Sequence, residues 1–345
     1  MKEVKDQNIK GYKPLVTPVE IQEEIVPSER SVSTVLESRK AIENVLDGKD
    51  DRKIMIVGPC SVHDYEVAMD YAARLKGLAD KVQDKFVVVM RTYFEKPRST
   101  LGWKGYMNDP DLDGSNDLEK GLILSRQLVS EITGMGLPCG TEFLNTRTPQ
   151  YLDDLISWGA IGARTTESQP HREMASGLSM PIGFKNNTYG EIAVAVDGVE
   201  AALHNHTFHG IDKSGRISEV RTRGNPYSHL ILRGGNGKPN YGEEIVKETQ
   251  EKLAARGLPQ NIIIDCSHDN TNKDHTLQPI VFEEAVRQMA AGNKNLVGVM
   301  IESNISEGQQ KLADPSDLKY GVSITDACVS FEMTNKMIMG AYRAL

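Results

Sequence analysis

The chain alternates short apolar runs with stretches of helical periodicity along most of its length. The apolar runs lie at 53–58, 85–94, 137–144, 160–166, 180–186, 229–235, 261–268 and 296–303. Helical patterns separate them, at 65–80, 117–135, 149–157, 191–203, 242–256, 279–291 and 323–342. Apolar runs without alternating polar residues are typical of strands buried on both faces, as in a parallel sheet. Eight such strands, each followed by a helix, predict an α/β fold of the (β/α)8 TIM-barrel class, with a doubly wound open sheet as the alternative.

Residues 1–50 precede the first predicted strand and do not follow this alternation. Thr17-Pro18 is typical of the start of a helix, because proline suits the first helical position. A second helix is predicted from Ser28 to Leu46. Its apolar residues recur near helical spacing, at Val32, Val35, Leu36, Ile42 and Leu46. We therefore expect an N-terminal helical extension lying on a barrel formed by residues 51–345.

Residues 207–224 form the second exception. They contain two β-like pieces around Lys213-Ser214-Gly215, a sequence typical of a tight turn. This pattern predicts a β-hairpin inserted between the fifth helix and the sixth strand of the barrel.

Composition and charge exclude several classes of protein. The 345 residues include 39% hydrophobic and 26% charged residues, which suits a globular protein with a sizeable core. A net charge of −8 argues against a general nucleic-acid binder, although a few local cations would still bind small anions. The polar N-terminus does not resemble a signal peptide, and no apolar run approaches the ~20 residues of a membrane span. We therefore expect a cytoplasmic protein with neither nucleic acid nor membrane as partner.

The chain has four cysteines, widely spaced and without a CxxC pair. This usage makes a disulfide scaffold improbable and favours a reducing compartment. Cys60 directly follows the first apolar run and a Gly-Pro turn. Its thiol has four possible roles: nucleophile, redox sensor, metal ligand or packing.

Polar side chains end all eight predicted strands. In this barrel class the carboxyl ends of the strands and the loops after them form the active site. The residues at these ends are Cys60, Arg91, Glu142, Arg164, Lys185, Arg233, His268 and Glu302. The four cations in this set would repel one another at one mouth unless an anion lies between them, so we expect an anionic ligand. Salt bridges at the barrel rim are the alternative.

A second group of cations follows the second strand, in Lys96-Pro97-Arg98-Ser99-Thr100. Arginine offers a bidentate fork to a phosphate, and hydroxyl groups satisfy the remaining phosphate oxygens. The long loop 101–116 that follows is of the length of a lid or binding loop. Two anion subsites are therefore predicted, although such basic turns also occur in solvated loops.

Cys60, His268, Glu302 and Asp326 form a possible set of metal ligands. Thiolate, imidazole and carboxylate together suit a cation of intermediate softness, such as Mn²⁺, Fe²⁺, Co²⁺ or Zn²⁺. Each residue also has a structural alternative: a small apolar side chain for Cys60, a hydrogen-bonded core residue for His268 and a helix cap for Asp326. Cys266 lies two residues from His268 on the same strand face, so spacing alone does not rank it below Cys60. His204, His206 and His209 are interpreted as solvated residues of the insertion.

Nine motifs, in order and over essentially the whole chain, resemble the 3-deoxy-D-arabino-heptulosonate 7-phosphate (DAHP) synthase family. The resemblance is to the microbial class with an N-terminal regulatory extension and an inserted hairpin. The motifs are GPCS (58–61), RTYFEKPRST (91–100), GWKG (102–105), ARTTESQPHRE (163–173), GFKN (183–186), ILRGG (231–235), DCSH (265–268), MIES (300–303) and SITDAC (323–328).

The resemblance implies the condensation of phosphoenolpyruvate with D-erythrose 4-phosphate and water, which gives DAHP and inorganic phosphate. This reaction opens the shikimate pathway to chorismate and the aromatic amino acids. The resemblance further implies a divalent metal, with Mn²⁺ favoured, and no organic cofactor. It also implies a homodimer or homotetramer that is feedback-inhibited by tyrosine or phenylalanine, through a site near Ser179, the extension and the hairpin.

The resemblance assigns roles residue by residue. It implies that Arg164 and Arg233 bind the phosphate of phosphoenolpyruvate, and that Arg91 and Lys185 bind its carboxylate. Erythrose 4-phosphate is assigned to Lys96, Arg98 and Ser99, where relatives often have threonine in place of Ser99. The implied metal ligands are Cys60, His268, Glu302 and Asp326, and the implied catalytic residues are Lys96, Lys185 and His268. Many relatives carry an apolar residue at Cys266, which argues against this cysteine as a ligand.

Three rival functions remain at this stage. A metal-dependent aldolase would use the same barrel, cations and metal, but would not release phosphate from phosphoenolpyruvate. A non-catalytic sugar-phosphate sensor would keep the anion subsites without needing the four ligands. An enzyme with Cys60 as its nucleophile would need a neighbouring base, for which His63 is a candidate.

Overall fold

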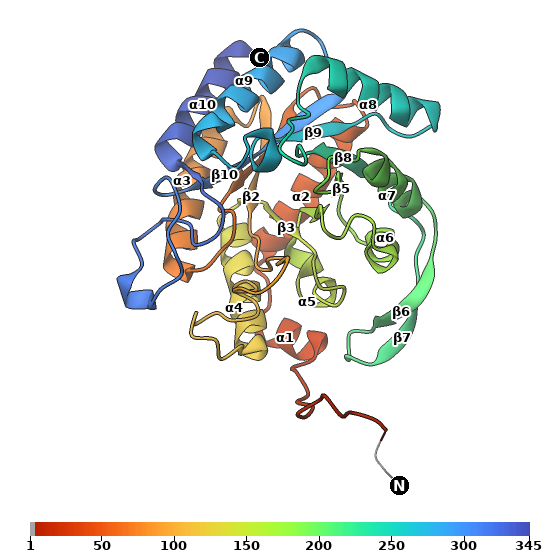
Figure 1. The fold of residues 1–345 in the computed structure, drawn as a ribbon, viewed down its shortest axis with the longest axis vertical. Helices are drawn as coiled ribbons and strands as arrows, with labels where there is room; N and C mark the ends of the chain where they lie inside the picture. The colour runs from red at the N-terminus through yellow and green to blue at the C-terminus, as the bar shows by residue number, and fades with distance from the viewer. Residues whose placement is uncertain (1–3) are drawn as a thin grey trace.

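Eight parallel strands close into a barrel in the computed structural model, which describes residues 4–345 (Figure 1). Neighbouring strands pair in chain order, and β1 pairs with β10 to close the ring, with Ile54 opposite Gly298 and Gly58 opposite Glu302. The (β/α)8 prediction is therefore confirmed, and the open sheet is wrong. The barrel strands are β1 (Lys53–Gly58), β2 (Phe86–Arg91), β3 (Cys139–Glu142), β4 (Trp158–Ile161), β5 (Ile182–Lys185), β8 (Ser228–Leu232), β9 (Ile262–Asp265) and β10 (Leu296–Asn304).

Helices pack around the outside of this ring (Figure 1). Several begin at a side chain that accepts a hydrogen bond from a free backbone N–H of the first turn, as Asp64 does from Val67 and Asp117 from Lys120. The helices are α3 (Tyr65–Val82), α4 (Leu118–Gly134), α5 (Pro149–Leu152), α6 (Gln169–Ala175), α7 (Ala193–Leu203), α8 (Glu243–Ala255), α9 (Gln278–Ala290) and α10 (Phe331–Ala344). Short 3₁₀ turns lie at Asp153–Leu155, His268–Asn270, His275–Leu277 and Pro315–Asp317.

Some predicted boundaries are wrong. The fourth strand lies at Trp158–Ile161 rather than 160–166, and α6 has no counterpart among the helical patterns. The last helix begins at Phe331, eight residues later than predicted, because Ser330 caps it while residues 323–330 stay irregular or form the short strand β11 (Val329–Ser330).

The extension closes the amino-terminal end of the barrel. Its longer helix, α2 (Glu29–Leu46), buries Ile42, Val45 and Leu46 in one apolar cluster with inward-facing residues of the strands, among them Ile54, Val89, Trp158 and Ile263. Two apolar positions of the predicted helix face do not share this role, because Val32 and Leu36 are 45% and 60% exposed.

The shorter helix, α1 (Pro18–Glu24), begins where the Thr-Pro signal predicts, and Thr17 and Glu20 also form a capping box. The predicted hairpin is also present, as antiparallel β6 (Thr207–Ile211) and β7 (Ile217–Arg221). The backbone N–H of Val19 donates to the carbonyl of Lys213 in the hairpin turn, over 2.8 Å. Extension and hairpin therefore lie side by side at the periphery (Figure 1).

Arg126 of α4 ties the extension to the barrel. Its buried guanidinium forms an ion pair with Asp154 (2.7 Å) and donates to the carbonyl oxygens of Ile25 (3.2 Å) and Tyr151 (2.8 Å). Within residues 4–345, no helix is both long enough and apolar enough to cross a membrane.

We expect Arg126→Ala to lower the free energy of unfolding by about 2 kcal/mol. The loss stays below the ~3–5 kcal/mol of a fully buried pair, because Asp154 is 38% exposed and remains partly hydrated. Urea unfolding measures it. Arg287→Ala, which removes exposed ion pairs to Glu243 and Glu284, serves as the control and should change stability much less. Equal losses in the two variants would show that Arg126 is not a structural tie.

Candidate active site

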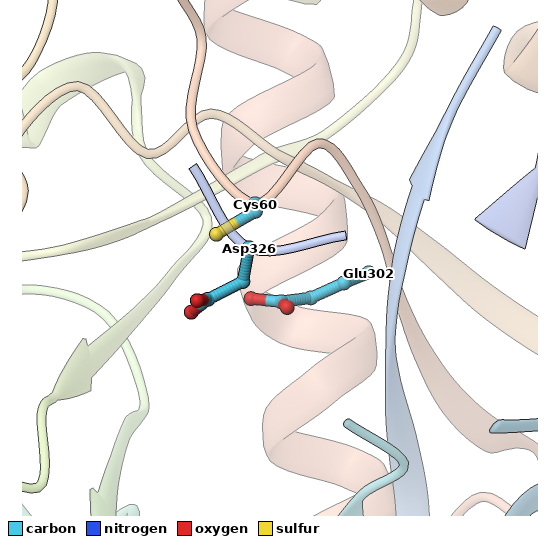
Figure 2. A group of neighbouring side chains, drawn as sticks. All are labelled: Cys60, Glu302 and Asp326. Atoms are coloured by element: carbon cyan, nitrogen blue, oxygen red, sulfur yellow. The ribbon is translucent and has the colours of Figure 1, made fainter. Parts of the chain in front are cut away.

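A thiol and two carboxylates meet at the carboxyl end of the barrel. One ligand atom from each of Cys60, Glu302 and Asp326 lies within 4.8 Å of the others, and Figure 2 shows the three side chains turned toward one another. Cys60 and Glu302 are buried, and Asp326 is partly buried. The structure thus brings together three of the four residues that the sequence suggests as metal ligands.

The fold explains why residues so far apart in the sequence converge. Cys60 follows β1, whose last residue, Gly58, lies opposite Glu302 on the neighbouring strand β10. Asp326 comes from the segment after β10, held by an isolated bridge between Gly308 and Cys328. A hydrogen bond of 2.7 Å between the hydroxyl groups of Ser61 and Thr325 joins this segment to the residues after β1. Asp326 is therefore not a cap of α10, which begins five residues later.

The fourth residue, His268, lies at the edge of this group. Its Nε2 is 3.6 Å from Oε1 of Glu302, while its Nδ1 is 2.9 Å from Oδ2 of Asp265 and 2.8 Å from the Ser267 hydroxyl. A carboxylate on one ring nitrogen orients the other nitrogen, as second partners of metal-binding histidines do. His268 also has a φ of +56°, in the left-handed region that non-glycine residues rarely adopt.

The electrostatics of the group favour a bound cation. Burial raises the pKa of the Cys60 thiol to about 11, and the nearby charge of Glu302 adds to this effect. Lys96 acts in the opposite sense, with its Nζ 3.1 Å from the Cys60 sulfur. Burial also opposes ionisation of Asp326, but the charges of Lys96 and His268 outweigh it and lower the Asp326 pKa. Because an ionised thiol and two carboxylates would repel one another here, this donor set fits a divalent metal.

Cys266 does not belong to the group. Its buried thiol lies 3.9 Å from the carbonyl oxygen of Ile264 in the preceding strand β9, and burial raises its pKa well above the usual value. All four cysteines are free and buried, as expected for a chain without a disulfide scaffold. Of the two cysteines that spacing leaves open, Cys60 is the one that lies beside the carboxylates of Glu302 and Asp326.

Three of the strand-end cations already have carboxylate partners. Arg91 pairs with Glu302 over 3.1 Å, Lys185 with Asp265 over 2.8 Å, and Arg233 with Asp269 over 2.6 Å. The alternative of salt bridges at the barrel rim is therefore present for these three cations, and mutual repulsion does not by itself require an external anion. Lys185 and His268 share the carboxylate of Asp265, and these two charges hold the pKa of Asp265 well below its usual value despite burial.

Beside this network lies a cavity of about 660 Å³ with a strongly positive wall. Its lining includes Glu95 as its sole carboxylate. Five of its basic side chains form no ion pair within residues 4–345, namely those of Lys96, Arg98, Lys104, Arg147 and Arg164. Arg164 Nε donates instead to the Ser99 hydroxyl, over 3.3 Å. The predicted basic turn and the predicted Arg164 therefore share one hollow, which suits an anion with several oxygens.

The barrel interior also holds polar atoms without protein partners. Oε1 of Glu142 and Nε of Arg233 are both buried and lack a hydrogen-bond partner within residues 4–345. Gly162 makes room for the Glu142 carboxylate, since a Cβ at this position would lie 2.1 Å from Oε1. Such orphaned atoms are satisfied by water or a ligand in most proteins.

Sequence reasoning missed several of these residues. Lys104 and Arg147 were not singled out, because neither ends a strand and both read as surface cations. Asp265 and Asp269 flank His268 in the sequence, and a carboxylate at the end of a buried strand could have indicated a partner for a neighbouring cation.

Known proteins resemble this chain over nearly its whole length. The Tyr-sensitive phospho-2-dehydro-3-deoxyheptonate aldolase of Escherichia coli K12 is 49% identical over 332 residues, covering 96% of this chain and 93% of that protein. The Phe-sensitive aldolase of the same strain is 48% identical over 333 residues, covering 96% and 95%. The solved structure of phospho-2-dehydro-3-deoxyheptonate aldolase from Francisella tularensis SCHU S4 superposes with a TM-score of 0.95 at 48% identity, covering 98% of each chain.

Residues 18–338 match the DAHP synthetase I family. This match agrees with the fold and with the nine sequence motifs, which extend over the same residues. The chain therefore belongs to the DAHP synthetase I family of enzymes.

Proposed function

We propose that the protein condenses phosphoenolpyruvate with D-erythrose 4-phosphate and water to DAHP and phosphate, the first step of the shikimate pathway. The observation that carries this proposal is the cavity with five basic side chains that form no ion pair within residues 4–345, next to the thiol and carboxylates of Cys60, Glu302 and Asp326. Two phosphorylated substrates need such a positive surface. Family membership supports the same reaction.

Phosphoenolpyruvate is assigned to four cations. Arg164 and Arg233 bind its phosphate, and Arg91 and Lys185 bind its carboxylate. Arg91 is held rigidly for this task, because its guanidinium packs 3.9 Å from the centre of the Tyr93 ring and donates to Glu302. Lys185 and its partner Asp265 are both buried, so a proton held at Lys185 Nζ is protected from bulk water.

Erythrose 4-phosphate is assigned to Lys96, Arg98 and Ser99. The Ser99 hydroxyl accepts a hydrogen bond from Arg164, so the two phosphate subsites are neighbours. Lys96 lines the cavity and its Nζ lies 3.1 Å from the Cys60 sulfur, which supports its assignment to the sugar near the reacting carbonyl. Arg98 is fixed by donating its Nε to the Trp103 carbonyl, over 2.9 Å.

Cys60, His268, Glu302 and Asp326 would hold the divalent metal, with Mn²⁺ favoured and Fe²⁺, Co²⁺ or Zn²⁺ as alternatives; no organic cofactor is needed. When bound, the metal supplies Lewis acidity at the aldehyde oxygen. The cations fix the two anionic substrates in attack geometry. C3 of phosphoenolpyruvate then bonds to the aldehyde carbon as its C2=C3 double bond opens, and the aldehyde oxygen takes up a proton. Water adds at C2 and gives up a proton, and the C2–O bond to phosphate breaks as the C2 carbonyl forms. Electrostatic stabilisation by these preorganised charges accounts for most of the rate enhancement.

Regulation and assembly follow the same relatives. We infer feedback inhibition by tyrosine or phenylalanine, because relatives are named Tyr-sensitive and Phe-sensitive. A second cavity, of about 390 Å³, lies between the hairpin and residues 146–147, and is lined by Phe208, His209 and Glu219 among others.

We further propose a homodimer or homotetramer in the cytoplasm, with residues 1–50 as the regulatory extension and residues 51–345 as the catalytic barrel.

Phosphate release tests the proposed reaction. We expect inorganic phosphate to appear only when phosphoenolpyruvate and erythrose 4-phosphate are both present, in a one-to-one ratio with a seven-carbon keto acid phosphate detected by mass spectrometry. Carbon–carbon bond formation without phosphate release would favour a metal-dependent aldolase. Binding of both substrates without turnover would favour a sensor.

A further inference from the structure

Glu95 directly precedes Lys96 and is 5% exposed, yet the reaction proposed above gives it no role. It is the sole carboxylate in the lining of the cavity whose other charged side chains are basic. Despite these neighbours, Glu95 forms no ion pair with a lysine or arginine within residues 4–345. The Glu95 carboxylate therefore does not neutralise the positive charges of the cavity wall through an ion pair.

The carboxylate instead binds a different segment. Oε2 of Glu95 accepts hydrogen bonds from the Thr148 hydroxyl (3.1 Å) and from the backbone N–H of Asn145 (3.3 Å). The backbone N–H of Leu144 is a third donor to the Glu95 carboxylate. Burial raises the pKa of Glu95 to about 7, and these three donors oppose that rise. Glu95 thus joins the end of the second barrel strand to the segment that follows the third.

That segment is itself held in place. The Leu144 carbonyl accepts from Nε2 of His171, over 2.7 Å. On the other side, Nε2 of Gln22 donates to the Gln150 carbonyl (3.0 Å), and the Tyr151 hydroxyl donates to the Val16 carbonyl (2.9 Å). Residues 144–151 are therefore attached both to α6 and to the N-terminal extension, and they offer Glu95 a rigid anchor.

Lys96 is held at its backbone and at the end of its side chain. Its backbone N–H donates to the Lys104 carbonyl over 2.8 Å, and its Nζ donates to the sulfur (3.1 Å) and the carbonyl oxygen (3.4 Å) of Cys60. Residues 98–102 beyond it are exposed. A shift of the Lys96 backbone would move its ammonium group away from the cavity wall, and small misplacements of this kind are costly in catalysis.

We propose that Glu95 is a positioning residue, which places Lys96 against erythrose 4-phosphate by anchoring the backbone before it to residues 144–148. This inference rests on the proposed function for the substrate it names, and on the hydrogen bonds alone for the anchoring. Glu95 acts through Lys96 and does not touch the reacting atoms.

Three variants test the anchor. Glu95→Ala removes the acceptor, and Thr148→Val removes one donor while leaving Glu95 in place. Thr148→Ser keeps the hydroxyl and is the matched control. Hydrogen–deuterium exchange of residues 92–105 should accelerate in Glu95→Ala and in Thr148→Val, and should stay at the wild-type rate in Thr148→Ser. This readout does not depend on activity.

Kinetics then test the link to Lys96. Thr148→Val should raise the KM for erythrose 4-phosphate roughly tenfold, the usual scale for one hydrogen bond to a charged group, and leave the KM for phosphoenolpyruvate within about twofold. The double variant Glu95→Ala/Thr148→Val should raise the KM for erythrose 4-phosphate no further than Glu95→Ala alone does. Unchanged exchange in both variants, or equal rises in the two KM values, would overturn the inference. Faster exchange in Glu95→Ala and Thr148→Val, together with a wild-type protein that does not catalyse the reaction, would instead contradict only the proposed function.

Discussion

Replacing Cys60 by alanine is expected to reduce metal-dependent activity by at least about 100-fold. The thiol is one of three donors within 4.8 Å of one another, and alteration even of the groups that support a metal ligand typically costs 10–100-fold in affinity or activity. The loss should be accompanied by loss of bound metal, measured by elemental analysis after gel filtration. Activity and metal content must both be measured, because if Cys60 were a nucleophile, the alanine variant would lose activity but still bind the metal.

Cys266→Ala is the matched control for this variant. Both cysteines are buried and free, and they follow β1 and β9, the two strands that pair with β10. Cys266 faces the Ile264 carbonyl in the preceding strand rather than the carboxylates, so its loss should leave metal content and activity close to the wild-type values. Retained activity in Cys60→Ala together with a defect in Cys266→Ala would reverse the assignment.

The second large effect is expected for Lys96→Met, which should lower kcat by about 100-fold or more. This is the scale on which removal of one preorganised charge lowers the rate. Lys96 is assigned to the erythrose 4-phosphate carbonyl, and its charge also holds down the Cys60 pKa, which burial raises to about 11. The methionine variant should therefore bind metal more weakly at neutral pH. Steady-state kinetics at saturating metal separate the loss in kcat from this weaker binding.

Lys53→Met provides a control for a half-buried lysine at the opposite end of the barrel. Lys53 begins β1, and its Nζ donates to the Lys294 carbonyl over 3.3 Å, far from the cavity. Its replacement should leave kcat near the wild-type value. A similar loss of kcat in both variants would mean that Lys96 supports the fold rather than the reaction.

The barrel could be predicted from the sequence because its strands are buried on both faces. KIMIVG at 53–58 is apolar without alternation, and the structure confirms a strand with these same bounds. Boundaries that depend on partners distant in the sequence were less predictable. Residues 323–330 have a helix-like pattern, but the bridge between Gly308 and Cys328 keeps them out of α10. No local pattern shows such a bridge.

The candidate site likewise has residues that could be predicted from the sequence and residues that could not. Cys60, Glu302 and Asp326 could be named from strand ends and motifs, and they do converge. The partners of the buried cations could not be named in this way. Arg91 pairs with Glu302 and Lys185 pairs with Asp265, and in each pair the two residues belong to different strands. Whether a buried cation awaits a ligand or already has a countercharge depends on pairing across the barrel, which spacing along one chain does not determine.

The most direct test of the central claim is phosphate release by metal-free protein. Wild-type protein is treated with a chelator, shown by elemental analysis to be free of metal, and assayed with phosphoenolpyruvate and erythrose 4-phosphate. Mn²⁺, Fe²⁺, Co²⁺ and Zn²⁺ are then added back one at a time. We predict no phosphate release before a metal is added and the greatest recovery with Mn²⁺. Full activity in the metal-free protein would contradict the assignment of Cys60, His268, Glu302 and Asp326 as metal ligands.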